Sequence, residues 1–161
     1  MKIQTKAVHA GDRKKAGAHV PVTTPIYTAS SYFYASMEEL DRVFGQEDPG
    51  YCYARYDNPT NAALEEQAAA LEAVLVNALA PLAAHPLVSE VRAGVGVIAG
   101  VQLTDQALAD RVKARCLEAG FLMRVITGAT LQISPPLTTQ PSEIQAIVDA
   151  IANALDREAG A

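Results

Sequence analysis

The sequence is poor in the residues that build metal sites, disulfide frameworks and aromatic cores. It has no tryptophan, two cysteines and three histidines among 161 residues, and aromatic side chains make up 6% of the chain. Cys52 and Cys116 lie in different segments without a C-x-x-C pattern, and His9, His19 and His85 are scattered. We therefore predict no metal site and no disulfide, and we expect both thiols to be reduced.

Positive charge and long apolar runs are scarce as well. Lys and Arg number 13 against 18 for Asp and Glu, a formal net charge of −5, and Arg13-Lys14-Lys15 is the one basic cluster. Because nucleic acid needs a basic face, we exclude it as a partner and interpret the cluster as a solvated loop rather than an anion site. No run approaches the roughly 18 apolar residues of a membrane span, and the first residues lack the apolar segment of a secretory signal. We expect a cytoplasmic protein with no membrane partner.

Residues 1–58 are predicted to form an extended N-terminal arm with one short helix. Glycines and prolines punctuate the segment up to Tyr34, which shows no sustained helix or strand period. Ser36 is a suitable N-cap, two glutamates follow in the first turn, and Gly45 can stop a helix over residues 37–44.

Residues 59–85 are predicted to be a connecting helical region that contains the junction between two different pieces, near Glu72. Asn58 suits the N-cap of this helix and Pro59 its first position. Its apolar stripe consists of Leu64, Ala68, Leu71 and Leu75. Pro81 should kink or break the helix, and Pro86 should end it.

Residues 86–161 are predicted to form a small α+β domain. Two strands are expected at residues 88–92 and 96–103 around Gly94, followed by a helix that Thr104 or Asp105 caps and Gly120 closes. Two more strands are expected at residues 121–126 and 130–134, and a last helix follows Thr139. The order ββαββα gives an antiparallel sheet with both helices covering one face.

The tyrosine-rich loop at residues 50–60 is the most informative run in the chain. Tyr53 and Arg55 are two residues apart, so in an extended segment they point the same way and offer a phenol and a guanidinium to one phosphate. Tyrosine-rich loops are also common at plain interfaces, and the loop alone favours that structural interpretation.

The order of motifs around this loop resembles the N-terminus of the cystathionine γ-synthase family over residues 3–72. The matching motifs are Val8-His9-Ala10-Gly11, Pro25-Ile26-Tyr27, Tyr53-x-Arg55-x-x-Asn58-Pro59-Thr60 and Leu64-Glu65 to Leu71-Glu72. This family comprises pyridoxal phosphate (PLP) enzymes of cysteine and methionine metabolism. The resemblance implies that Tyr53 and Arg55 reach the PLP phosphate of a neighbouring subunit, which reverses the preference for a purely structural loop.

Residues 74–159 are similar to a different family, the C-terminal domain of class III PLP-dependent aminotransferases. The matching motifs are Ala83-Ala84-His85-Pro86-Leu87-Val88, Val91-Arg92-x-Gly94-x-Gly96, Gly100-Val101-Gln102-Leu103, Gly120-Phe121-Leu122-Met123-Arg124 and Ile133-Ser134-Pro135-Pro136-Leu137. By this resemblance Arg124 binds a substrate carboxylate, whereas without it Arg124 would be interpreted as a strand-end surface arginine. The large PLP-binding domain of fold type I enzymes has no counterpart in the sequence.

A lysine that could hold the cofactor covalently is not identifiable. The lysines are Lys2, Lys6, Lys14, Lys15 and Lys113. Four fall in the arm and Lys113 falls on the polar side of a helix, so none follows a buried strand, and no catalytic residue is named. We expect PLP by resemblance only, and not bound by this chain alone.

Three functional hypotheses remain open. The first is a fragment or fusion of PLP enzymes that is not catalytically complete. The second is a PLP-dependent transferase that is active only as a homo-oligomer or with a partner subunit that supplies the lysine. The third is a non-catalytic dimerisation module that uses the apolar helix face from Leu64 to Leu79.

Overall fold

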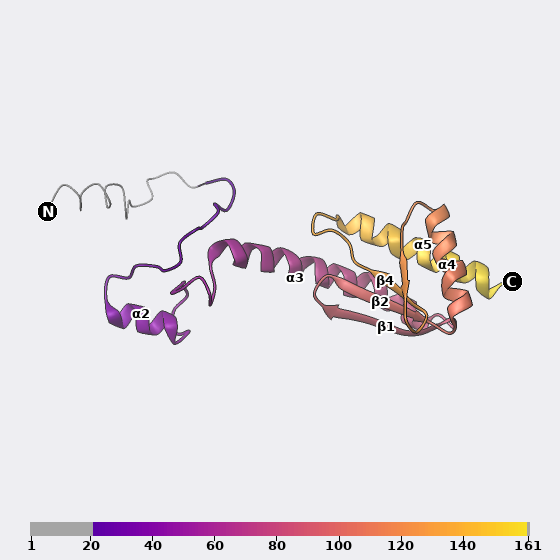
Figure 1. The fold of residues 1–161 in the computed structure, drawn as a ribbon, viewed down its shortest axis with the longest axis horizontal. Coiled ribbons are helices and arrows are strands. Elements are labelled where there is room, and N and C mark those ends of the chain that lie inside the picture. The colour runs from indigo at the N-terminus through magenta and orange to yellow at the C-terminus, as the bar shows by residue number, and fades with distance from the viewer. Residues whose placement is uncertain (1–20, 161) are drawn as a thin grey trace. The chain divides into compact units, whose positions relative to one another are not determined.

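The computed structural model describes residues 21–160, which form two compact units (Figure 1). The first unit is Met1–Asn61 and the second is Ala62–Ala161. The predicted division into residues 1–58, 59–85 and 86–161 stays a prediction. Each unit is described by itself below.

In the first unit, a short helix follows the arm as predicted. Helix α2 spans Met37–Phe44, and the Ser36 side chain accepts a hydrogen bond from the Glu39 backbone N–H at 3.2 Å. Gly45 ends the helix. Of its apolar residues, Val43 is buried whereas Met37 and Phe44 are largely exposed.

Backbone pairing fixes the tyrosine loop against the arm. The Ala54 N–H donates to the Ser30 carbonyl at 2.9 Å, and the Tyr32 N–H donates to the Cys52 carbonyl at 3.3 Å. The Tyr27 N–H donates to Thr60 Oγ1 at 2.8 Å. Two motifs that are far apart in the sequence, Pro25-Ile26-Tyr27 and Asn58-Pro59-Thr60, therefore meet in this unit.

Helix α3, Pro59–Leu79, begins where the sequence predicts. Asn58 Oδ1 accepts from the N–H groups of Thr60 at 2.8 Å and Asn61 at 3.0 Å, which satisfies donors that the first helical turn leaves unpaired. Pro81 has the predicted effect: the α-helix ends and a 3₁₀ turn, η1, spans Ala80–Ala84.

The expectation that no segment is long and apolar enough to span a membrane is corrected by this helix. Pro59–Ala84 has the required length and composition, although one such helix is weak evidence. Its leucines at positions 71, 75, 79 and 82 are buried in the core of the second unit, whereas 22% of its apolar window is buried overall. Leu64, predicted on the same stripe, is 52% exposed.

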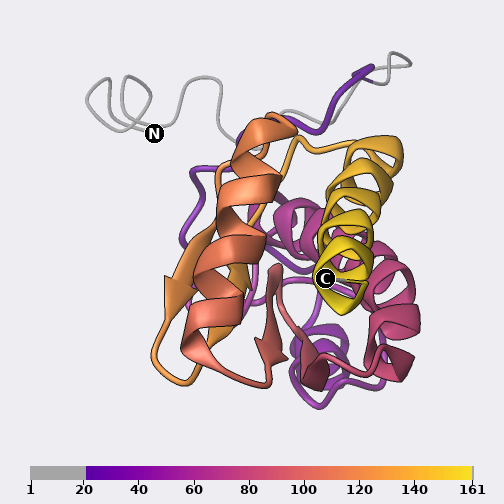
Figure 2. The same ribbon diagram turned by 90° about the vertical axis from the view of Figure 1, so that its right-hand side faces the viewer.

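The second unit contains the predicted ββαββα domain. Its elements are β1 (Val88–Val95), β2 (Ile98–Leu103), α4 (Gln106–Glu118), β3 (Arg124–Ile126), β4 (Thr130–Ile133) and α5 (Pro141–Ala159). The strands form one antiparallel sheet in the order β1-β2-β4-β3. Figure 2 shows α4 and α5 side by side over one face of this sheet, as expected.

The core lies between the helices and this face of the sheet. Alternate strand residues point into it, and the fully or almost fully buried ones are Ala99, Val101, Leu103, Leu131 and Ile133. The helices contribute Leu71, Leu75, Leu79, Leu108, Val112, Cys116, Ile144, Val148, Ile151 and Leu155. The opposite face of the sheet carries polar side chains together with the exposed Ile98 and Ile126; it is called the polar face below.

Some predicted boundaries are displaced. The first hairpin turns at Gly96 and Val97 rather than at Gly94, because Val95 still pairs with Ile98. Residues 121–123 lie outside β3. Helix α5 follows Thr139 as predicted, with Gln140 as its N-cap: the Gln140 N–H donates to Glu143 Oε2 at 2.7 Å as half of a capping box.

An acidic side chain near the end of α5 joins the two covering helices. Glu158 is 6% exposed and accepts hydrogen bonds from Arg111 Nε at 2.6 Å and Arg115 Nε at 2.7 Å, both on α4. These bonds lower the pKa of Glu158. The ion pairs therefore hold the ends of α4 and α5 together.

Candidate functional site

The first candidate site is a tight turn at Tyr53. The Tyr53 carbonyl accepts from the N–H groups of Tyr56 at 2.9 Å and Asp57 at 3.3 Å, and Tyr53 itself bridges to Ser31. The segment is thus a turn within the predicted loop, and not the extended segment from which Tyr53 and Arg55 were expected to point the same way. The reason is local hydrogen bonding: the Tyr53 carbonyl is satisfied within the loop and cannot continue a strand ladder.

Tyr53 and Arg55 nevertheless lie together. The guanidinium carbon of Arg55 is 5.3 Å from the centroid of the Tyr53 ring and 5.5 Å from that of Tyr56. The two rings themselves are 6.4 Å apart, edge to face. Arg55 is therefore in cation–π contact with two tyrosines.

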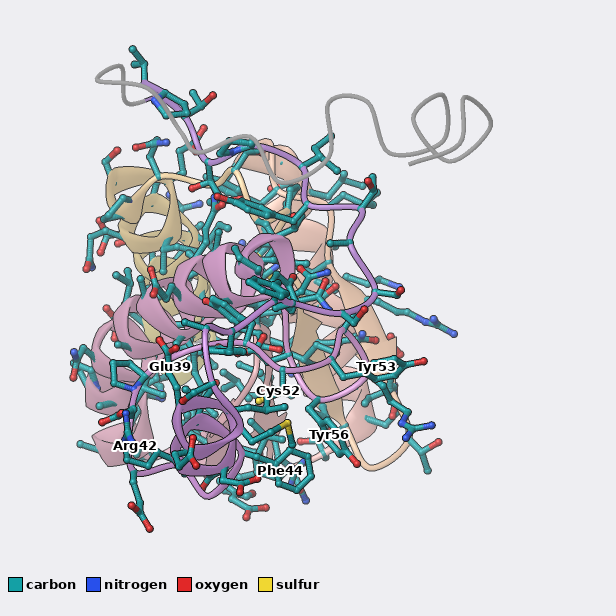
Figure 3. The ribbon with its side chains drawn as sticks, turned by 90° about the vertical axis from the view of Figure 1, so that its left-hand side faces the viewer. Glu39, Arg42, Phe44, Cys52, Tyr53 and Tyr56 are labelled. Atoms are coloured by element: carbon teal, nitrogen blue, oxygen red, sulfur yellow. The ribbon has the colours of Figure 1, made fainter. Side chains whose placement is uncertain are left out.

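The Tyr56 ring is in turn supported by helix α2. Phe44 lies at the end of that helix, 5.5 Å from Tyr56 between ring centroids and perpendicular to it. Figure 3 shows Phe44 and Tyr56 side by side, with Tyr53 next along the loop and Arg42 on the other side of the helix. Sequence reasoning missed both supporting rings. The signal was there, since aromatic residues stand at the end of a predicted helix and next to Arg55.

Within the part of the chain that the structure describes, Arg55 makes no hydrogen bond and no ion pair. Arg42, in contrast, is paired with Asp48 at 2.7 Å. A planar guanidinium with unengaged N–H donors suits a phosphate or carboxylate oxygen pair. The turn thus presents an exposed, unpaired cation whose position is set by aromatic rings.

The second candidate, Arg124, lies at an edge of the sheet. It is part of a row of paired residues that crosses the sheet. Arg124 pairs with Gln132 of β4, and from there the row continues to Gly100 of β2 and Arg92 of β1. Directly paired residues point to the same side of an antiparallel sheet, so both arginines lie on the polar face. Arg124 is exposed, and among the described residues it has no hydrogen bond or ion pair. It lines a shallow cavity of about 470 Å³ together with Gln132.

Arg92 was not a predicted site residue, and its side chain, unlike that of Arg124, is hydrogen-bonded to three neighbouring side chains. It is bonded to Glu90, to Gln102 Oε1 at 2.7 Å and to the buried Thr130 Oγ1 at 2.9 Å. Gly100 lies beside this pair: a Cβ there would stand 2.9 Å from Thr130 Cγ2, and 3.8 Å from Arg92 Nη2, which is an ordinary contact. Arg92 is thus a structural residue of the polar face, and Arg124 is the cation left available.

The described residues fit the phosphate group of PLP but not its aldehyde. Arg55 offers unengaged donors for a phosphate. Lys113 is the one lysine within residues 21–160; it lies on the surface of α4, with its Nζ 3.9 Å from Asp110 Oδ1. The four arm lysines fall outside the described residues. No chemical step through the cofactor is derived for this chain.

Metal and thiol chemistry find no support either in the described part of the chain. No group of three or more His, Cys, Asp or Glu side chains within residues 21–160 is arranged to hold a metal ion. Both cysteines are free. Burial raises the pKa of Cys116 to about 11, so its thiol stays protonated and unreactive near neutral pH.

Two family profiles match the chain. The profile of Cys/Met metabolism PLP-dependent enzymes matches residues 4–101, and that of class-III aminotransferases matches residues 55–155. Each covers more than half of the chain, and the two overlap over residues 55–101. This mixed resemblance agrees with the two resemblances derived from the motifs.

Curated relatives come from both families. The homocysteine/cysteine synthase of Kluyveromyces lactis is 46% identical over 70 residues, which is 44% of this chain and 16% of that protein. The L-methionine gamma-lyase of Treponema denticola is 44% identical over 69 residues, 42% of this chain and 16% of that protein. The putrescine–pyruvate aminotransferase of Pseudomonas aeruginosa is 37% identical over 90 residues, 50% of this chain and 19% of that protein.

Solved structures give the same picture for the fold. A transaminase obtained by ancestral reconstruction superposes with a TM-score of 0.57 at 34% identity, over 63% of this chain and 25% of that one. The omega transaminase of Pseudomonas jessenii in complex with PMP superposes with a TM-score of 0.54 at 30% identity, over 61% of this chain and 24% of that one. The chain thus spans less than a fifth of these curated relatives and about a quarter of these solved structures. It belongs to the PLP-dependent enzymes, with the Cys/Met metabolism family matched over residues 4–101 and the class-III aminotransferases over residues 55–155.

Proposed function

We propose that this chain is a fusion of parts of two PLP-dependent enzymes that keeps anion-binding side chains and is not catalytically complete on its own. The parent activities are transsulfuration-type lyase or transferase chemistry for the first part and amino-group transfer for the second. Tyr53 and Arg55 bind the phosphate of PLP, and Arg124 binds a substrate carboxylate. The protein acts in the cytoplasm.

The observation that carries this proposal is the contrast between Arg55 and Lys113. Arg55 is exposed, in contact with two tyrosine rings, and unpaired among the described residues. Lys113 is 44% exposed on a helix surface, next to Asp110. A lysine that forms a covalent bond to a cofactor needs a site that excludes water, and this surface does not exclude it.

The test uses the purified full chain with PLP. After borohydride reduction, peptide mass spectrometry maps any phosphopyridoxyl group on the five lysines. We expect weak labelling that is spread over several lysines and no greater than that of a control protein with similar lysine content. A single lysine that labels to saturation would refute the claim that the chain is catalytically incomplete.

A second candidate function is supported by the exposure of Tyr53 and Arg55. Here the chain completes the PLP site of a partner subunit. The test is complementation: a Cys/Met-family enzyme whose own equivalent tyrosine and arginine are replaced by alanine is mixed with this chain. Retention of PLP on gel filtration with the native chain, but not with an Arg55→Ala variant, would favour this function. Equal loss of PLP with both would argue against it.

A third candidate function, a dimerisation module, is supported by Leu64, which is 52% exposed on an apolar helix. Sedimentation velocity would test it, with Leu64→Glu as the matched variant. A dimer that the variant abolishes supports this function, and a native chain that sediments as a monomer at high micromolar concentration rules it out.

A further inference from the structure

We infer that Tyr56, braced by Phe44, is a positioning residue for Arg55 and sets the orientation in which its guanidinium meets a phosphate dianion. This inference rests on the proposed phosphate role of Arg55 and adds two residues to that site. Neither residue belongs to the Tyr53-x-Arg55 pair that the sequence predicted. The contacts run from Phe44 on helix α2 to Tyr56 in the loop, and from Tyr56 to the Arg55 guanidinium.

Helix α2 is a defined anchor for this chain of contacts. It is capped by Ser36 at its start and by the Gly45 N–H, which donates to the Asp41 carbonyl at 2.8 Å, at its end. Val43 fixes the helix from its buried side. Phe44, the last residue of the helix, therefore has a set position and presents its ring to the loop.

The contact between Phe44 and Tyr56 has a specific geometry. The ring centroids are 5.5 Å apart and the ring planes are at 90°. In an edge-to-face pair the positive edge of one ring meets the negative face of the other, which is worth more than area burial alone. Because both rings are more than half exposed, this geometry is what restrains Tyr56.

Tyr56 in turn restrains Arg55. An arginine side chain on a turn has many rotamers, and binding an anion would have to overcome their entropy. Two rings, 5.3 and 5.5 Å from the guanidinium carbon, already limit these rotamers. A cation–π contact uses the charge of the guanidinium and no hydrogen-bond donor, so the N–H donors stay available for a ligand.

Only the ring of Tyr56 enters this argument. Its hydroxyl makes no hydrogen bond within residues 21–160. The inference therefore separates two substitutions: Tyr56→Phe keeps the stacking surface, whereas Tyr56→Ala removes it. A purely direct role of the phenol in binding would be lost in both.

The experiment is nuclear magnetic resonance of the full-length chain labelled with ¹⁵N. The first readout is the heteronuclear Overhauser effect of the Arg55 Nε–H group without ligand, which reports side-chain order. The second is the dissociation constant for inorganic phosphate and, separately, for PLP, from shift titrations of the same signal. The variants are Tyr56→Phe, Tyr56→Ala and Phe44→Leu, with Met37→Ala as the control, because Met37 is an exposed apolar residue of the same helix.

We expect Tyr56→Ala to make the Arg55 Nε–H group mobile and to weaken phosphate binding roughly two- to five-fold, the value of one exposed cation–π contact. Tyr56→Phe and Met37→Ala should match the native chain, and Phe44→Leu should lie between. The backbone chemical shifts of α2 show whether a variant unfolds the unit. If Tyr56→Ala does so, the order of the Arg55 Nε–H group in Phe44→Leu tests the inference instead.

Three results would overturn the inference or the proposal beneath it. Unchanged Arg55 order in Tyr56→Ala would show that Tyr56 does not position Arg55. Weaker binding with unchanged order, or loss in Tyr56→Phe, would assign Tyr56 a direct role instead. If phosphate binding is not saturable, or survives Arg55→Ala when it is followed by the backbone amide shifts of the loop, the proposed phosphate site fails; the order readout on the native Arg55 still tests the positioning claim independently.

Discussion

The division of helix α3 between an exposed first half and a buried second half leads to a quantitative prediction. Leu79 is fully buried and belongs to the core of the second unit, whereas Leu64 on the same helix is 52% exposed. Replacing a buried leucine by alanine removes its transfer free energy and leaves a cavity, at a cost of about 2 to 5 kcal/mol. Because the Leu79 side chain meets core residues on all sides, we expect about 3 kcal/mol for Leu79→Ala.

That cost is large for a unit of this size. Domains unfold with about 5 to 15 kcal/mol, and 1 kcal/mol moves the melting temperature of a small domain by roughly 4 to 8 °C. Leu79→Ala should therefore lower it by roughly 10 to 25 °C. The matched control Leu64→Ala should change the unfolding free energy by less than about 0.5 kcal/mol, since it removes an exposed side chain and alanine favours helices.

Urea unfolding followed by circular dichroism at 222 nm measures both variants, because the chain has no tryptophan for a fluorescence assay. The midpoint should shift without a change in slope if the unit stays cooperative. Equal losses for the two variants, or a Leu79→Ala loss below about 1 kcal/mol, would refute the packing assigned to this helix.

Three further predictions concern the second unit and the arm. Gly100→Ala places a Cβ 2.9 Å from Thr130 Cγ2, and should cost about 1 to 3 kcal/mol of unfolding free energy. Adding Thr130→Ser, which removes that methyl and keeps the hydroxyl bonded to Arg92, should recover part of the loss in the same urea assay; no recovery would locate the strain elsewhere. Glu158→Gln should lower the melting temperature at pH 7. The pKa of Glu158 is lowered in the folded state, so its ion pairs contribute fully to folding stability above the unfolded pKa of about 4.3. This contribution is lost as the pH falls through the folded pKa. The melting temperatures of the native chain and of Glu158→Gln should therefore converge in acid. A gap that does not shrink as the pH falls would contradict this. In the first unit, the Tyr32 hydroxyl is buried without a hydrogen-bond partner among residues 21–160, and Tyr32→Phe should leave arm stability unchanged or higher; a lower stability would reveal a partner for this hydroxyl.

Local signals were sufficient to predict most elements of the fold. The N-caps at Ser36, Asn58 and Asp105 are side-chain hydrogen bonds within a few residues, so sequence determines them directly. The break at Pro81 likewise follows from the chemistry of one residue. Antiparallel pairing of the strands followed from their order along the chain.

Features that depend on tertiary geometry were not predictable in the same way. The hairpin turned two residues beyond Gly94 because strand register depends on the partner strand, which decides which of several glycines takes the turn. The N-cap of α5 is Gln140, a residue type that rarely caps helices, because Glu143 bonds back to its N–H in the folded chain.

For the candidate sites, the sequence named the cations but not their surroundings. Arg55 was recognised through a motif, yet the expected extended backbone is a turn, and the rings that hold Arg55 come partly from helix α2. Arg124 and Arg92 share a face only because of the strand order β1-β2-β4-β3, which the sequence does not state. The pairing that neutralises Arg92 and leaves Arg124 available is visible only in the structure.

The ion pairs at Glu158 have a consequence for handling the protein. Glu158 joins α5 to two arginines of α4. Proteolysis within the last turn of α5, before residue 158, would remove the carboxylate and leave the two arginines without a counter-charge. Preparations that contain cleaved α5 would then differ in heat resistance from intact ones, and the intact mass should be verified before any melting curves are compared.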